Sequence, residues 1–391
     1  MSAASEIAAL LRREFELRNT ISAAYIPPHS GPLAEVCQEM SRRFLRGGRL
    51  LALGRGPYLT DAQHVSVEFV HPVIVGKRAL PAVDLSAAPE RMLDVLARPD
   101  DIVMGFGPPE GDSQLHTLLD RVRQRGALVC QWPGRLGDYP LAATTDDPFI
   151  HQELTEVMYH TLWETVHVFF EQTGQGGDVG ASAFLYPFLG KGDQTPRDTL
   201  SDVAASIRQK AADDERLRTA FLAEQSDRFV DAAIAVGQQI ASGGTLLAFG
   251  NGGSATDAND LVLDCVDPPP GMRPIPAISL SMEPANISAI ANDVGVELVF
   301  LRQLIANGRS GDVAVAISTS GKSTNIIAAL GEARKRGMLT LALLGYDGGD
   351  ILRDGLADHV LVVRSDYIPR IQEVQASIYH VLRLALSKLA V

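Results

Sequence analysis

Two loops rich in glycine and hydroxyl side chains have the composition of phosphate-binding sites. In the first, residues 250–254 (GNGGS), three glycines let the backbone approach an anion closely. The second, residues 318–323 (STSGKS), concentrates hydroxyl donors that suit phosphate oxygens. A tight turn would explain either loop alone, but two such loops favour a phosphate site. The predicted substrate-binding residues here are Asn251, Gly252, Gly253, Ser254, Ser318, Thr319, Ser320 and Ser323.

The end of the second loop, Gly321-Lys322-Ser323, also matches the end of a nucleotide-binding P-loop. That motif requires a glycine five residues before Gly321, and this position holds Ala316. Because the glycine that shapes the loop is missing, we do not expect an NTPase.

Each loop directly follows a short apolar run that has the pattern of a strand buried on both faces. Such runs occupy residues 246–249, 313–317 and 339–344, and helix-length segments separate them, as in a parallel sheet of βαβ units. Ligands of open α/β sheets bind where strands end and helices begin. With amphipathic helices expected over 227–242 and 371–390, the sequence predicts a three-layer α/β domain.

The same pattern occurs twice in the chain. Residues 44–56 (FLRGGRLLALGRG) align with 240–252 (IASGGTLLAFGNG), and each segment is followed by Thr-Asp-Ala. Further matches follow in the same order, 80–86 with 275–281 and 152–160 with 372–380. Ordered matches indicate a duplication. The first copy lacks about two dozen residues, which we place between Ser86 and a strand at 101–104.

The Gly-rich stretch 173–194 has the composition of a linker between the two copies. We therefore predict two domains, 1–190 and 191–391.

Four motifs in the second copy resemble the sugar isomerase (SIS) family, specifically its phosphoheptose isomerase branch. They are residues 250–254, Ala291-Asn292-Asp293, 317–323 and 370–373 (RIQE), and the resemblance as a whole covers nearly all of 196–391. The first copy resembles the family more weakly, over 1–172. The resemblance implies an α/β fold of two tandem three-layer α/β/α SIS domains with parallel sheets and long flanking helices. It adds Asn292, Asp293 and Gln372 to the predicted substrate-binding residues.

The resemblance also implies an activity, the interconversion of sedoheptulose 7-phosphate and glycero-manno-heptose 7-phosphate through an enediolate. The family places a His and a proton-transferring Glu four residues apart on one helix, and a Gln and a His eight apart on the last helix. Both spacings put the pair on one helical face. In the first copy these four residues could hold zinc: His64, Glu68, Gln152 and His160. Glu68 and His160 are the predicted catalytic residues.

Each copy departs from the family pattern where the other keeps it. The second copy has Asp260 and Asp264 at the positions of His64 and Glu68, with His380 intact. An aspartate carries its carboxylate one methylene closer to the backbone, and proton transfer depends on exact placement. The first copy has Arg, Pro and Phe in its loops, 54–58 and 105–109, and lacks the Asn-Asp pair.

One hypothesis is therefore a composite site, with phosphate held by the second copy and the acid-base and metal residues supplied by the first. The alternative is that the first copy is a decayed structural copy, and that the chemistry lies in the second copy with Asp264 and His380. A non-catalytic sugar-phosphate sensor or protein adaptor also remains open. An aminosugar-phosphate enzyme would need a catalytic lysine, for which Lys322 is a poor candidate.

Composition limits the classes of partner. A net charge of −12 and a pI near 5.2 argue against a nucleic-acid-binding surface. Three scattered cysteines, Cys37, Cys130 and Cys265, suit a reducing cytosol better than a disulfide framework. The charged N-terminal segment 1–19 predicts an amphipathic helix, and no stretch has the length of a membrane span. Because single-domain members of the family form tetramers, we expect a homodimer with four SIS domains.

Overall fold

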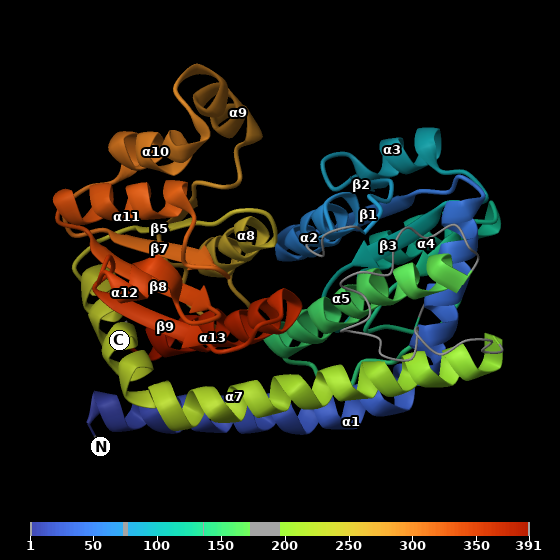
Figure 1. Ribbon diagram of the computed structural model, residues 1–391, viewed down its shortest axis with the longest axis horizontal. Coiled ribbons are helices and arrows are strands. Elements are labelled where there is room, and N and C mark those ends of the chain that lie inside the picture. Colours follow the sequence, from blue (N-terminus) through green and yellow to red (C-terminus); the bar gives the residue numbers. More distant parts are fainter. Residues whose placement is uncertain (1, 73–76, 136, 173–195, 390–391) are drawn as a thin grey trace. The chain divides into compact units, whose positions relative to one another are not determined.

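The computed structural model describes residues 2–72, 77–135, 137–172 and 196–389 (Figure 1). Contacts divide the chain into two compact units. The N-terminal unit is Thr20–Asp213, and the C-terminal unit is Met1–Asn19 together with Asp214–Val391. The expected linker, 173–194, and the expected boundary at residue 190 lie outside the described residues.

A four-stranded parallel sheet forms the centre of the N-terminal unit, in the order β2-β1-β3-β4. Apolar strands alternate with helices along the chain, as the βαβ pattern predicts. The elements, starting with a helix that is shared with the other unit, are α1 (Ala3–Leu45), β1 (Leu50–Gly54), η1 (Gly56–Tyr58), α2 (Leu59–Val70), β2 (Ala82–Asp84), α3 (Pro89–Leu96), β3 (Ile102–Phe106), α4 (Ser113–Gln124), β4 (Leu128–Cys130) and α5 (Pro148–Gln172).

The C-terminal unit contains a five-stranded parallel sheet in the order β6-β5-β7-β8-β9. Its elements, again starting with a shared helix, are α7 (Pro196–Ala241), β5 (Leu246–Phe249), α8 (Gly253–Val266), β6 (Ala277–Ser279), α9 (Pro284–Asp293), η3 (Val296–Leu298), α10 (Val299–Asn307), β7 (Val313–Ser318), α11 (Thr324–Lys335), β8 (Leu339–Gly345), α12 (Gly349–Arg353), β9 (His359–Val363) and α13 (Ile368–Leu389).

Helices cover both faces of each sheet, which confirms the predicted three-layer α/β fold class. In the C-terminal unit, Leu246 and Val313 pack with residues of α7, α8 and α13, whereas their neighbours Leu247 and Ala314 pack with α10 and α11. This alternation follows from the two-residue period of a strand. The predicted strands 246–249, 313–317 and 339–344 are confirmed as β5, β7 and β8.

The two long helices each contribute to both units. The start of α1, with Ile7, Leu11 and Phe15, is buried in the core of the C-terminal unit. The start of α7, with Val203 and Ile207, is buried in the core of the N-terminal unit. Each unit is therefore completed by a helical segment from the other half of the sequence, an exchange that the expected limits 1–190 and 191–391 do not describe.

The residues missing from the first copy are divided between two places, and our placement of all of them between Ser86 and the strand at 101–104 was wrong. The N-terminal unit has α3 between β2 and β3, where the C-terminal unit has α9, η3 and α10. Within the described residues, its sheet also ends at β4, whereas the C-terminal sheet continues from β8 to β9. Among the described helices, none combines the length and apolarity needed to cross a bilayer.

Candidate functional site

The two predicted phosphate loops lie next to each other at the carboxyl edge of the C-terminal sheet. The strands that lead into them, β5 and β7, are parallel neighbours, with Phe249 opposite Ala316 near their ends. β6 lies on one side of β5 and β7 on the other, so the direction in which successive strands are added to the sheet reverses between β5 and β7. Ligands of open α/β sheets bind at such a switch point.

The loop after β5 needs its glycines for steric reasons. Gly252 has φ 58, in the left-handed region that favours glycine. A Cβ on Gly250 would lie 2.2 Å from the backbone oxygen of Ser254. The hydroxyl of Ser281 fixes this turn, accepting from the Gly250 N–H at 3.1 Å and donating to the Gly250 carbonyl at 3.0 Å. The turn delivers Ser254 to the first turn of α8.

The loop after β7 is held by the segment that follows β8. Gly321 has φ 62, and a Cβ there would lie 2.3 Å from the carbonyl oxygen of Gly348. The Ile351 N–H donates to the Gly321 carbonyl at 3.1 Å. Inside the loop, the Ser318 hydroxyl accepts from the Gly321 N–H at 3.2 Å. Ser320 and Ser323 are only partly buried, so their hydroxyls are accessible to a ligand.

Asn325 joins the two loops and was missed at the sequence level. Its side-chain amide and that of Asn251 each donate a hydrogen bond to the other, at 2.9 and 3.0 Å. Asn325 lies in the first turn of α11, directly after the hydroxyl-rich loop. That position, at the start of a helix beside a phosphate loop, was the signal that could have found it.

Two of the predicted substrate-binding residues lie elsewhere. Asn292 and Asp293 form the last turn of α9, where both are exposed and Asn292 Nδ2 donates to Asp293 Oδ1 at 2.8 Å. Within the described residues, neither makes a hydrogen bond to the phosphate loops. Gln372 is buried on α13.

In the N-terminal unit, three of the four residues predicted to bind metal come together. His64 and Glu68 lie on one face of α2, and His160 approaches from α5. The Nε2 atoms of the two histidines are 3.4 Å apart, and His64 Nε2 is 3.8 Å from Glu68 Oε1. All three residues are buried, and their ligand atoms lie within 4.8 Å of one another. Two imidazoles and a carboxylate form a donor set that suits zinc.

The fourth predicted ligand, Gln152, points to the start of α2. Its Nε2 donates to Thr60 Oγ1 and to Asp61 Oδ2, both at 3.2 Å. Thr60 and Asp61 lie one turn before His64 on the helix. Gln152 therefore ties α5 to α2 beside the cluster of His64, Glu68 and His160.

A second buried cluster occupies the equivalent place in the C-terminal unit. Asp260 and Asp264 lie on α8, and His380 Nε2 on α13 is 3.3 Å from a carboxylate oxygen of each. Tyr379, which the sequence analysis did not select, donates its hydroxyl to Asp260 Oδ2 at 2.8 Å. A Tyr-His pair stands at this point of both copies, as Tyr159-His160 and Tyr379-His380, and that repetition was the available signal.

The surroundings of Asp264 favour its neutral form. Burial, together with the negative charge of Asp260, raises the pKa of Asp264 to about 7, and hydrogen bonding to His380 opposes part of this shift. A carboxyl group with a pKa near neutrality, next to an imidazole, can accept or donate a proton. Both clusters thus combine carboxylate and imidazole groups suited to proton transfer.

Comparisons with known proteins confirm the resemblance. A family model described as "SIS domain" matches residues 211–345. The phosphoheptose isomerase of Desulfovibrio desulfuricans is 43% identical over 178 residues, which cover 45% of this chain and 83% of that protein. The phosphoheptose isomerase of Nitratiruptor sp. is 46% identical over 138 residues, 35% of this chain and 73% of that protein.

Several solved structures resemble nearly the whole chain. One of them is the C-terminal domain of glucosamine-fructose-6-phosphate aminotransferase from Francisella tularensis, with a TM-score of 0.60 over 97% of this chain and 96% of that one. The sequences are 9% identical, so this likeness concerns the fold alone.

Proposed function

Because this chain belongs to the SIS-domain family and is an isomerase similar to phosphoheptose isomerases, we propose that it acts on a phosphorylated heptose. The proposed reaction interconverts sedoheptulose 7-phosphate and glycero-manno-heptose 7-phosphate. The observation that carries the proposal is the pair of phosphate loops at the switch point of the C-terminal sheet, joined by Asn251 and Asn325. Their N–H groups and hydroxyls would hold the phosphate group.

Aldose–ketose isomerisation moves one proton between C1 and C2, so it needs a group that can take the proton from one carbon and return it to the other. We assign this role to Glu68, whose carboxylate is buried against two imidazoles. In the metal-free site, His160 would carry a proton to or from a sugar oxygen as the enediolate forms and collapses; with zinc bound, its imidazole would serve as a ligand instead. The equivalent pair in the C-terminal unit, Asp264 and His380, is the alternative.

His64, Glu68 and His160 would hold a zinc ion, since their ligand atoms lie within 4.8 Å of one another. When bound, zinc would supply positive charge that stabilises a developing oxyanion. Glu68 has two carboxylate oxygens, so one could hold the ion while the other takes the proton. Gln152 remains the proposed fourth ligand only if its side chain turns from Thr60 and Asp61.

The test is isomerisation of sedoheptulose 7-phosphate by the purified protein, with and without added zinc. Activity lost in Glu68→Gln but kept in Asp264→Asn would support Glu68 as the proton carrier. Loss in Asp264→Asn alone would move the chemistry to the C-terminal cluster. Glu110→Gln, at an exposed position, is the matched control and should keep full activity. That both copies contribute to one composite site stays a prediction of the sequence.

The second candidate function is a non-catalytic sugar-phosphate sensor or protein adaptor. The observation that favours it is the pair of aspartates, Asp260 and Asp264, in the unit that keeps the phosphate loops. A parent protein that binds sugar phosphate but shows no isomerisation would reject the heptose phosphate isomerase and support the sensor.

We also propose that the chain arose by tandem duplication. Matched contacts support this proposal: the Ser86 hydroxyl accepts from the Gly54 N–H at 2.9 Å, as the Ser281 hydroxyl accepts from Gly250. We further propose a cytosolic homodimer that forms a pseudo-tetramer of SIS domains. The three cysteines, which are free and buried, fit a reducing compartment.

A further inference from the structure

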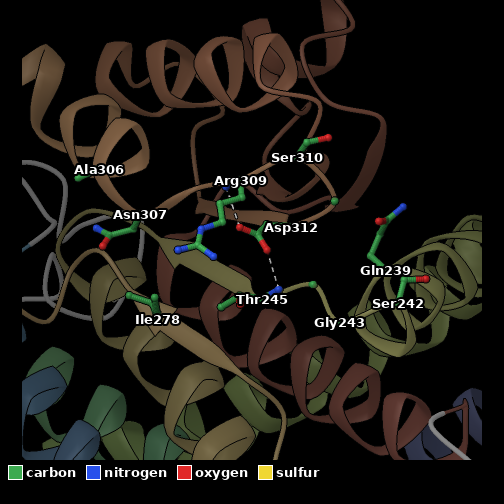
Figure 2. Close-up of a pocket in the computed structure, with 12 residues that line it drawn as sticks. Gln239, Ser242, Gly243, Thr245, Ile278, Ala306, Asn307, Arg309, Ser310 and Asp312 are labelled. Carbon is green, nitrogen blue, oxygen red and sulfur yellow. Dashed lines mark hydrogen bonds between the residues drawn. The ribbon is translucent and has the colours of Figure 1, made fainter.

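The C-terminal unit has a polar pocket at the amino edge of its sheet, opposite the phosphate loops. This amino-edge pocket has a volume of about 460 Å³ and lies where α7 ends, β5 begins and the 308–312 turn leads into β7. Figure 2 shows its lining side chains, among them Gln239, Ser242, Thr245, Asn307, Arg309 and Asp312. Neither the phosphate loops nor the two buried clusters include these residues.

The equivalent place in the N-terminal unit is filled by an arginine that the C-terminal unit lacks. Strand pairing aligns the two sheets, because Leu50 pairs with Ile102 as Leu246 pairs with Val313. The residues just before these strands therefore correspond, Arg49 to Thr245 and Asp101 to Asp312. Arg49 forms a two-point ion pair with Asp101, Nε to Oδ1 at 3.3 Å and Nη2 to Oδ2 at 2.8 Å, and Nη2 also donates to the Leu96 carbonyl at 2.6 Å.

A second arginine occupies the same region of the N-terminal unit. The Nη1 group of Arg43 donates to the carbonyl oxygens of Pro99 at 2.7 Å and Gly126 at 3.1 Å. By position in the repeat, Gln239 replaces Arg43. A third arginine, Arg46, pairs with Asp100 at 2.7 Å, and its counterpart is Ser242. In the C-terminal unit these three guanidinium groups are therefore absent.

Asp312 keeps the backbone contacts of its counterpart but not the charge partner. Its carboxylate accepts from the N–H groups of Thr245 and Arg309, both at 2.8 Å, just as Asp101 accepts from Arg49 and Arg98, both at 2.9 Å. Asp312 is only 6% exposed. Among the described residues, no basic side chain forms an ion pair with it. A buried carboxylate without a cation is costly, and a guanidinium matches it with two parallel hydrogen bonds.

We propose that the amino-edge pocket binds a small molecule carrying a guanidinium group, which takes the position that Arg49 fills in the N-terminal unit. The planar guanidinium would bind Asp312 through two N–H groups and the Asn307 carbonyl through a third, as Arg49 binds Asp101 and Leu96. Arg309 forms no ion pair with any described residue, and Figure 2 shows its side chain at this pocket. Its guanidinium is placed to bind an acidic group on the same ligand.

This inference does not depend on the proposed isomerase activity, because none of the residues involved belongs to that site. The probe is L-arginine, whose binding to the full-length protein is measured by isothermal titration calorimetry. We expect binding by the parent protein. Thr245→Arg rebuilds the Arg49 side chain and should weaken L-arginine binding by at least about tenfold, because it fills the position and pairs with Asp312. The N-terminal unit already contains this pair, so the variant should fold.

Two further variants complete the test. Thr219→Arg adds the same charge at an exposed position of α7 and should leave the affinity unchanged. Arg309→Gln should weaken L-arginine binding by less than Thr245→Arg does. Absence of binding by the parent, or equal binding by Thr245→Arg, would overturn the proposal. Loss of L-arginine binding only in Arg309→Gln, with inorganic phosphate binding to the parent, would instead show an anion site.

Discussion

Asn251 and Asn325 each donate one side-chain amide hydrogen bond to the other, at 3.0 and 2.9 Å, and so connect the loop after β5 with the first turn of α11. The Asn325 side-chain oxygen also accepts from the Ile326 N–H at 2.9 Å. The relative position of the two phosphate loops therefore depends on Asn325. A phosphate group held by N–H groups from both loops needs that position to be fixed.

Replacing Asn325 by alanine should weaken substrate binding. Because the loops lose two mutual hydrogen bonds, we expect KM for the sugar phosphate to rise by about tenfold, and the free energy of unfolding to fall by about 1 kcal/mol. Steady-state kinetics and urea unfolding measure the two effects. Asn286→Ala, at an exposed position in α9, is the control. An unchanged KM in Asn325→Ala would show that the bridge does not shape the phosphate site.

Three glycine-to-alanine substitutions should change the free energy of unfolding by amounts that differ in sign and size. Gly331 lies inside α11, and an added Cβ would meet no atom within 4 Å, so Gly331→Ala should stabilise by about 0.5–1 kcal/mol. Gly252→Ala has space, but its backbone at φ 58 and ψ −127 is one that alanine rarely adopts, so it should cost about 1–3 kcal/mol. Gly321→Ala should cost more, because its Cβ would also meet Gly348. Urea unfolding measures the stability of the three variants. If Gly321→Ala were no less stable than Gly252→Ala, that would contradict the close contact between Gly321 and Gly348.

The stability of the metal-free protein should depend on the ionisation of Asp264. Its pKa is raised from 3.8 to about 7 in the folded chain, so the folded state binds the extra proton between these values. The unfolding free energy should therefore fall as pH rises from about 4 to about 7, and become independent of this group above that range. Asp264→Asn should flatten this slope. Urea unfolding of the chelator-treated parent and Asp264→Asn at pH 5 and pH 7.5 tests this prediction. It would be contradicted if the unfolding free energy of both proteins changed equally with pH.

Removing metal should lower activity if His64, Glu68 and His160 hold zinc. We expect treatment with a chelator to reduce the isomerisation rate and added zinc to restore it. Elemental analysis should find metal in the parent and less than about a tenth of it in His160→Ala, since one of three protein ligands is lost. A His29→Ala variant removes a histidine distant in sequence, in α1, and should retain the metal. Full activity after complete metal removal would contradict the zinc proposal.

The predicted homodimer can be tested by size-exclusion chromatography with light scattering. We expect a mass of twice 41.9 kDa at micromolar concentration. A monomer with full isomerase activity would contradict the pseudo-tetramer of SIS domains.

Sequence periodicity was sufficient to predict the strands, because β5, β7 and β8 are apolar on both faces and bounded by turns. It underestimated the helices. The helix expected over 1–19 continues to Leu45 through three prolines, and the helix expected from residue 227 begins at Pro196. An amphipathic pattern shows which face of a helix is buried, but not the surface that it packs against. The exchange of helical segments was therefore not predictable.

For the site, residue type and spacing were enough where one helix sets the geometry, as for His64 and Glu68. They were insufficient where contacts join distant segments. The Asn251–Asn325 pair spans 74 residues of sequence, and Asp260–Tyr379 spans 119. The pairing of the two sheets was also needed to recognise that Thr245 stands where the other unit has Arg49.

The start of α1 packs against residues that are synthesised much later. During translation, Ile7, Leu11 and Phe15 leave the ribosome early. The second part of α7, α8 and α13, whose residues form the core around them, is made much later. Their apolar face must therefore wait in the nascent chain until almost all of the protein has been made. The N-terminal unit needs residues up to Asp213 before its own core is complete. Neither unit can complete its core from its own half of the sequence, so each must finish folding only after translation has passed well beyond the middle of the chain.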